Sequence, residues 1–116
     1  MKTILTAAQS AKLIELGIDP KLASAGEVVG DLYIGDIRFI PIFAFADIFP
    51  ILPKEIWVDK FYHRLVFDWS YGEWYVCYQG NGRMMGDHHA PEFIDAIYNL
   101  LIWAIENKFV KTNKDN

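Results

Sequence analysis

The side chains best suited to metal binding gather in one short segment, Asp87-His88-His89. Imidazole nitrogens and carboxylate oxygens are both common zinc ligands, and Glu92 and Asp95 follow closely in the chain. Zinc sites usually combine four closely spaced ligands, and no cysteine or third nearby histidine completes this set. We therefore expect no metal and no other cofactor, and we interpret the segment as a polar loop that helps to cap the next helix.

Cys77 and His63 are the residues that could act as a nucleophile and its base. Thiol chemistry needs a base in contact with the sulfur, together with groups that stabilise the developing charge. Nothing else in the sequence builds such a site, and a lone cysteine between two strand residues is typical of a small buried side chain. His63 likewise lies on the apolar side of a predicted strand, which favours a place in the core.

These patterns weigh against an enzyme. We expect instead a non-catalytic interaction or accessory protein. The alternative hypothesis is a small hydrolase or metal-dependent enzyme in which His63 joins Asp87, His88 and His89. That alternative requires the four side chains to converge in one concave site.

Aromatic side chains gather around a predicted hairpin and form a candidate contact surface. Its members are Trp69, Tyr71, Trp74 and Tyr75. Trp and Tyr are enriched at the energetic centres of protein interfaces, although the same residues could also fill the core of a small sheet. We hypothesise a contact surface whose partner is either a second copy, forming a homodimer, or a host protein.

Composition narrows the possible partners. The 116 residues carry a formal net charge of −4, the sequence pI is near 5.2, and 53% of the residues are hydrophobic. An acidic chain without a basic face is not typical of nucleic-acid-binding proteins. The longest apolar run, residues 39–52, contains prolines and is shorter than a membrane span. We therefore expect a single cytoplasmic domain over residues 1–116, without nucleic-acid or membrane partners, whose end is frayed from about residue 110.

Two helices are predicted at the ends of the chain. A capping-box pattern at Thr6 begins a helix over residues 6–16, and Gly17 supplies its left-handed cap. A second helix is predicted over residues 90–108, with Pro91 at its first position. Its apolar residues recur at helical spacing, which indicates a face packed on a sheet.

The middle of the chain has the pattern of a meander of strands. Alternating apolar side chains and turn residues predict strands over residues 32–34 and 37–43, within residues 57–69, and over residues 74–79 and 83–85. A short helix is predicted over residues 45–53, and residues 21–30 are interpreted as a linker. The pattern favours an α+β fold, a small antiparallel sheet packed by the N- and C-terminal helices in two layers. The alternative is an open sheet whose second face is buried in a dimer.

Four segments resemble a known group of proteins. They are Thr6-x-x-Gln9-Ser10-Ala11-Lys12-Leu13-x-Glu15-Leu16-Gly17-Ile18, Leu52-Pro53, Trp74-Tyr75 and Asp95-Ala96-x-x-x-Leu100-Leu101-Ile102-Trp103-x-Ile105-Glu106-Asn107. In their order the chain resembles small uncharacterised proteins of gut Bacteroidetes genomes and their phages. The resemblance rests on caps and core positions and carries over no activity and no functional residue. It implies an intracellular setting and a gene carried on a mobile element or phage.

Overall fold

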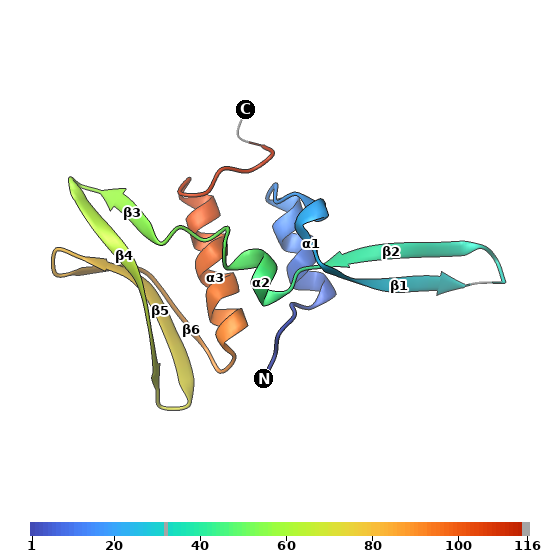
Figure 1. Cartoon of the computed structure of the whole chain (residues 1–116), viewed down its shortest axis with the longest axis horizontal. Coiled ribbons are helices and arrows are strands. Elements are labelled where there is room, and N and C mark those ends of the chain that lie inside the picture. The colour runs from blue at the N-terminus through green and yellow to red at the C-terminus, as the bar shows by residue number, and fades with distance from the viewer. Residues whose placement is uncertain (32, 115–116) are drawn as a thin grey trace.

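The computed structural model of the chain describes residues 1–31 and 33–114 and confirms the α+β class. Two helical segments come first, α1 (Ala7–Glu15) and a 3-10 turn over Pro20–Leu22. A hairpin of β1 (Ala25–Asp31) and β2 (Asp36–Ile42) leads into the short helix α2 (Phe45–Ile48). The meander consists of β3 (Glu55–Val58), β4 (Phe61–Ser70), β5 (Glu73–Gly80) and β6 (Arg83–Ala90). The helix α3 (Phe93–Glu106) follows the meander (Figure 1).

The helix α1 has the ends that its sequence predicts. The Gln9 backbone N–H donates to Thr6 Oγ1 over 3.1 Å, and the Thr6 N–H donates to Gln9 Oε1 over 2.9 Å. These two bonds satisfy backbone donors that the first turn of a helix leaves free. Gly17 follows with a φ of +105°, and Ile18 is buried behind it. The prediction of this helix is therefore confirmed.

The four-stranded sheet is a simple antiparallel meander, β3-β4-β5-β6. Its three connections are two-residue turns, Asp59-Lys60, Tyr71-Gly72 and Asn81-Gly82, in which both residues have positive φ. This backbone conformation matches the right-handed twist of the strands that it joins. The strand predicted within residues 57–69 is confirmed as β4, but the prediction missed the turn at Asp59-Lys60, which assigns residues 57–58 to β3.

The last strand is longer than predicted. Residues 86–89, expected as a loop, continue β6 to Ala90, because β5 offers a hydrogen-bonding edge for the whole length. Pro91 is accordingly not the first residue of the final helix, which begins at Phe93 with Glu92 as its N-cap. The Glu92 carboxylate accepts a hydrogen bond from the Lys2 backbone N–H over 3.1 Å. The expected cap from the Asp87-His88-His89 segment is therefore wrong.

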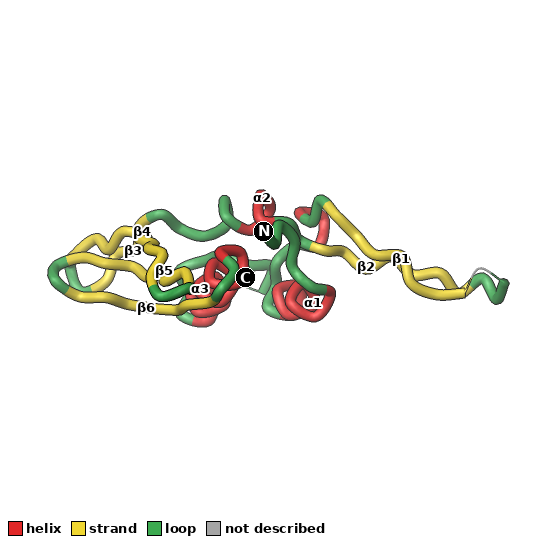
Figure 2. Tube along the Cα trace, turned by 90° about the horizontal axis from the view of Figure 1, so that it is seen from below, coloured by secondary structure: helices red, strands yellow, loops and turns green. Residues whose placement is uncertain are grey.

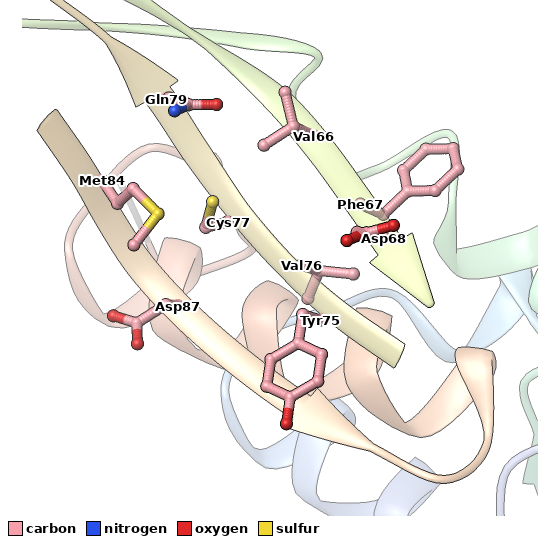
Figure 3. Close-up of a pocket in the computed structure, with 9 residues that line it drawn as sticks. All are labelled: Val66, Phe67, Asp68, Tyr75, Val76, Cys77, Gln79, Met84 and Asp87. Atoms are coloured by element: carbon pink, nitrogen blue, oxygen red, sulfur yellow. The ribbon is translucent and has the colours of Figure 1, made fainter. Parts of the chain in front are cut away.

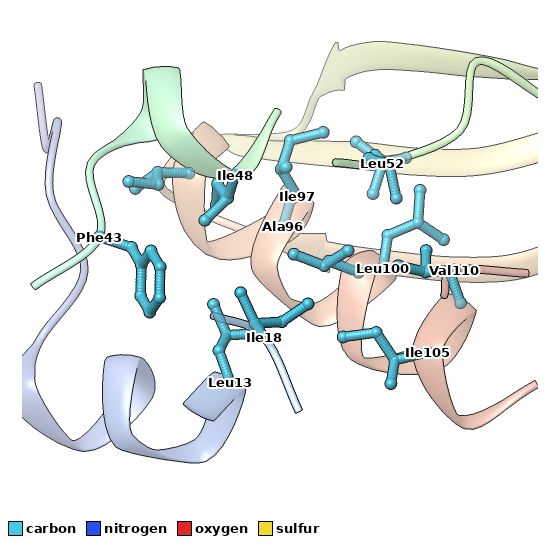
Figure 4. Close-up of a cluster of buried hydrophobic side chains, with 14 of the residues drawn as sticks. Leu13, Ile18, Phe43, Ile48, Leu52, Ala96, Ile97, Leu100, Ile105 and Val110 are labelled. Atoms are coloured by element: carbon cyan, nitrogen blue, oxygen red, sulfur yellow. The ribbon is translucent and has the colours of Figure 1, made fainter. Parts of the chain in front are cut away.

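The helix α3 lies at the centre of the core. One side packs against β5 and β6, where Val76, Tyr78 and Ala90 are buried. The other side meets α2 and the residues around α1, including Leu13 and Ile18 (Figure 4). Within the described residues α1 lies beside α3 and contacts β2, whereas α3 alone forms the main helical contacts of the four-stranded sheet (Figure 1).

The β1–β2 hairpin projects from this core as an arm. Residues 21–30 were interpreted as a linker, but residues 25–31 pair antiparallel with residues 36–42. The strand expected over 32–34 is absent from the described part, since Tyr33 and Ile34 lie in the turn; Leu32 lies outside the described residues. The arm extends along the long axis (Figures 1 and 2), which measures 60 Å against 40 and 17 Å for the others.

The end of the chain is packed through its described part. Val110 is buried, and the Asn113 backbone N–H donates to the Gly17 carbonyl over 2.8 Å. The expected fraying from residue 110 therefore does not describe residues 110–113, and residues 115–116 lie outside the described chain.

Candidate functional site

The three residues considered for metal binding follow one another on β6. Successive side chains of a strand point to opposite faces, so the three do not share one face of the sheet. His88 Nδ1 lies 2.6 Å from the Gly86 carbonyl oxygen. His89 Nδ1 lies 2.7 Å from Glu73 Oε2, and its ring stacks on Tyr75 with centroids 5.2 Å apart. Among the described residues, no three His, Cys, Asp or Glu side chains are placed to hold a metal ion.

His63 is buried on the side of the sheet that faces the core, with 1% of its surface exposed. Its Nδ1 lies 3.2 Å from the Phe61 carbonyl oxygen, and its Nε2 has no hydrogen-bond partner within the part of the chain described. The register pairs His63 with Ile56 on β3, whereas His88 pairs with Val76 on β5. The two histidines therefore occupy different parts of the sheet.

Cys77 lies on the opposite face of the sheet from His63. It pairs with Val66 and faces a hollow of about 350 Å³ (Figure 3), whereas the side chains of its neighbours Val76 and Tyr78 point toward the core. The register therefore does not bring the thiol and the His63 imidazole together. The four side chains of the enzyme hypothesis likewise do not converge.

The hollow at Cys77 is mostly apolar. Its lining includes Val66, Tyr75, Cys77 and Met84, with Asp68 and Asp87 at its sides (Figure 3). Burial raises the pKa of the Cys77 thiol, and the negative charge of Asp87 raises it further. A thiol in these surroundings stays protonated at neutral pH and is a poor nucleophile.

The four aromatic residues of the predicted contact surface do not share one face. Trp69 and Trp74 pair across β4 and β5 with ring centroids 5.3 Å apart, and Trp74 lies 4.8 Å from the Phe93 ring. Tyr75 points to the other face, and Tyr71 stands in the turn with 98% of its surface exposed. As a contact surface they would offer two small areas joined by a turn.

An exposed apolar face lies on the arm. Cross-strand partners share a face, and each strand alternates its side chains between the two faces. The register therefore places on one face the residues Gly26, Val28, Gly30, Ile37, Phe39 and Pro41. Val28, Ile37 and Phe39 remain 69%, 47% and 66% exposed. We call these six residues the apolar face of the arm.

Phe39 packs over Gly26 on this face. A Cβ atom added to Gly26 would come within 2.0 Å of the Phe39 ring, so the ring lies directly over that glycine. The opposite face of the arm carries the charges, with Glu27, Asp31, Asp36 and Arg38. The arm thus presents one uncharged surface and one charged surface.

The base of the arm is fixed by Asp47 at the start of α2. Its Oδ2 accepts hydrogen bonds from the Ser24 backbone N–H (2.9 Å), the Ser24 hydroxyl (2.8 Å) and the Ala44 N–H (2.7 Å). Burial acts to raise the pKa of Asp47, but these hydrogen bonds outweigh it and lower the pKa below the ordinary value of 3.8. The start of β1 is therefore held against α2 by a charged acceptor.

Sequence reasoning predicted the second strand of the arm, over residues 37–43, but missed the first strand because Ser24, Gly26 and Gly30 have the composition of a linker. One signal could have found it. Val28-Val29 is a β-branched pair, and Gly35-Asp36 separates it from the apolar residues that begin at Ile37. A second strand before that turn would have completed a hairpin.

Comparison of the chain with protein families, with curated proteins and with solved structures gives no match. Over the described ranges, none of the helices is long and apolar enough to span a membrane. The case for a function therefore depends on the surfaces described above.

Proposed function

We propose that this chain is a non-catalytic binding protein that contacts a protein partner through the apolar face of its arm. The observation that carries the proposal is the exposure of Val28, Ile37 and Phe39 on a hairpin whose two faces are uncovered among the described residues outside its base. Contiguous apolar surface of this kind usually marks an interaction site. This differs from the aromatic contact surface predicted from the sequence, which stays a prediction.

The energetics of hairpins support this proposal. A two-stranded hairpin alone is at best marginally stable in water, because it has too little apolar surface to bury. Among its described residues, the arm gains core contacts only at its base, where Ile42 and Phe43 are buried. A partner that covers the apolar face would supply the missing burial at about 25 cal/mol for each Å² of apolar surface.

The alternative, a hydrolase or metal-dependent enzyme, gains no support from the geometry. It requires His63, Asp87, His88 and His89 to converge, and the register distributes them over two faces of the sheet. Cys77 is kept in its thiol form and lies on the face away from His63. We therefore favour binding over catalysis.

A photo-crosslinking amino acid tests the proposal in cells that carry the gene. Benzoylphenylalanine is placed at Phe39 on the apolar face, at Arg38 on the opposite face of the same strand, and at Tyr71 in the exposed β4–β5 turn. We expect a discrete protein adduct from position 39 and none from position 38.

Two results would contradict the proposal. An adduct at position 71 but not at position 39 would move the contact to the aromatic hairpin that the sequence predicted. The absence of any adduct at position 39 would leave the arm without a role in binding. The adduct mass also identifies the partner as a second copy or a host protein, the latter in keeping with the phage or mobile-element setting that the resemblance implies.

A further inference from the structure

We propose that the hollow at Cys77 binds a small organic cation, an ammonium ion attached to an apolar group. The hollow lies on the face of the four-stranded sheet that points away from α3, so the inference does not depend on the role of the arm (Figure 3). Three features support it: the bulge that shapes the hollow, its apolar lining, and two carboxylates that no positive charge of this face neutralises.

A bulge in β6 brings one of these carboxylates to the hollow. The register shifts opposite Cys77, where β6 carries two residues against one of β5. Gly86 has a φ of +65°, the left-handed conformation that the first residue of such a bulge adopts. Met84 and Asp87 are three positions apart, and a regular strand would turn them to opposite faces. Because of the bulge, both side chains line the hollow.

The lining can hold an apolar group. Cys77 is buried and Val66 half-buried, whereas Tyr75 and Met84 are 41% and 64% exposed and form the rim. The volume of about 350 Å³ falls in the range of small-molecule sites, which are mostly apolar with a few polar groups. The face of an aromatic ring such as that of Tyr75 attracts organic cations, and the flexible Met84 side chain can adapt to a ligand.

The charge of the hollow is negative. Asp68 and Asp87 line it from β4 and β6, on either side of β5, and neither has an ion pair or a hydrogen bond within the part of the chain that is described. None of the described lining residues is Lys, Arg or His. The charge of Asp87 also raises the pKa of the Cys77 thiol, so it acts on the buried part of the hollow.

The basic side chains of the same face have carboxylates of their own. Arg64 Nε lies 3.8 Å from Glu55 Oε2, and His89 Nδ1 lies 2.7 Å from Glu73 Oε2. The two carboxylates of the hollow therefore repel an anion and attract a cation, while a neutral apolar molecule gains nothing from them. An ammonium ion with an apolar group complements both the charge and the lining.

Nuclear magnetic resonance titration of the purified full chain tests the inference. Three probes share a phenyl group and differ in charge: phenethylammonium, phenethyl alcohol and hydrocinnamate. We expect phenethylammonium to shift the backbone amide signals of Val66, Cys77 and Asp87 in a saturable manner. The alcohol and the carboxylate should leave these signals in place at the same concentrations. The amide signals of the arm report any contact of the phenyl group with its apolar face.

Matched variants identify the charges responsible. Asp68→Asn and Asp87→Asn each remove one carboxylate from an exposed side chain of the hollow. Each should raise the dissociation constant of phenethylammonium about threefold to tenfold. Asp36→Asn changes the net charge equally on the distant arm and should leave the dissociation constant unchanged.

Four results would overturn the inference. They are the absence of a saturable shift with phenethylammonium, equal shifts with phenethyl alcohol, unchanged binding in both hollow variants, and an equal loss of binding in Asp36→Asn. If an oligolysine peptide shifts the signals of the hollow but phenethylammonium does not, the hollow takes basic side chains of a protein, and the small-cation site is excluded. The crosslinking test at position 39 is independent of all these results.

Discussion

At the scale of single residues, the most informative group is Cys77. It is 8% exposed and lines the hollow on the open face of the sheet, where the negative charge of Asp87 raises the pKa of its thiol. Burial and this negative charge both favour the neutral thiol. The same surroundings make the residue a poor nucleophile.

The reactivity of Cys77 is therefore predicted to rise when Asp87 is neutralised. Asp87→Asn should lower the pKa of the thiol and increase its alkylation rate at fixed pH roughly two- to fivefold, the effect of about 0.5–1 kcal/mol of Coulomb energy. The thiolate is the reactive form, so the rate in both proteins should rise with pH until the pKa is passed. Iodoacetamide labelling followed by mass spectrometry measures the rate.

The control for this prediction is Asp68→Asn. Asp68 lines the same hollow, but it is not among the groups that shift the Cys77 pKa. Its neutralisation should leave the rate unchanged. Equal acceleration in both variants would show that access to the hollow, and not charge, limits the reaction.

At the scale of elements, Asp47 connects the arm to the helical core. Asp47→Ala removes an acceptor of three hydrogen bonds, and we expect it to lower the free energy of unfolding by about 1–2 kcal/mol near neutral pH. Because the folded pKa of Asp47 is lowered, its contribution is complete above the unfolded value and is lost as the pH falls through the folded value. The stability difference between wild type and variant should therefore shrink below the ordinary value of 3.8.

Urea unfolding near neutral pH and in acid measures this difference. Asp36→Ala at the outer end of the arm is the matched control, since Asp36 is exposed. It should change the free energy of unfolding by no more than about 0.5 kcal/mol. A constant difference in the free energy of unfolding across the acid range would mean that the Asp47 charge does not stabilise the base of the arm.

Contact between β6 and α3 depends on a glycine. Gly86 has a φ of +65°, and an added Cβ would lie 2.7 Å from the Trp103 ring. Gly86→Ala should therefore combine backbone strain with overpacking and cost about 2–4 kcal/mol of unfolding free energy.

The companion variant Gly72→Ala separates these two causes. Gly72 has a φ of +77° with nothing within 4 Å of the added Cβ, so only the backbone strain of about 1–2 kcal/mol is expected. Guanidinium unfolding of both variants gives the comparison. Similar losses in the two would show that β6 and α3 adapt to the extra methyl group.

At the scale of the whole molecule, the arm and the core are separable. Residues 28–39 contribute no side chain to the buried core within the described chain, whereas Ile42 and Phe43 do. Replacing residues 28–39 by Asn-Gly keeps the paired residues at the base of the hairpin and supplies a suitable two-residue turn. We expect the free energy of unfolding to change by less than about 1 kcal/mol, as for other surface changes.

The same shortened chain should be more compact. Small-angle scattering should give a radius of gyration below the 16.1 Å of the full chain and close to that of a compact chain. A large loss of stability would instead show that the arm belongs to the fold of the monomer.

Much of the fold could be predicted because its signals are local. The Thr6–Gln9 capping box, the turns Tyr71-Gly72 and Asn81-Gly82, and the apolar repeat of α3 each depend on residues a few positions apart. The turn at Asp59-Lys60 escaped notice because neither residue is a glycine, although both have positive φ. The candidate site was less predictable, since it depends on which surface stays uncovered.

By itself, the sequence determined the α+β class, the terminal helices and most turns, since capping bonds and backbone preferences act within one short segment. Only the tertiary structure decided that residues 25–31 form a strand, that His63 and Cys77 face opposite ways, and that the arm stays exposed. Strand partners and burial depend on residues far apart in the chain, and the Val28-Val29 pair within Gly26–Gly30 favours a strand without fixing its partner or its exposure. For that reason the apolar face of the arm became visible only in the folded chain.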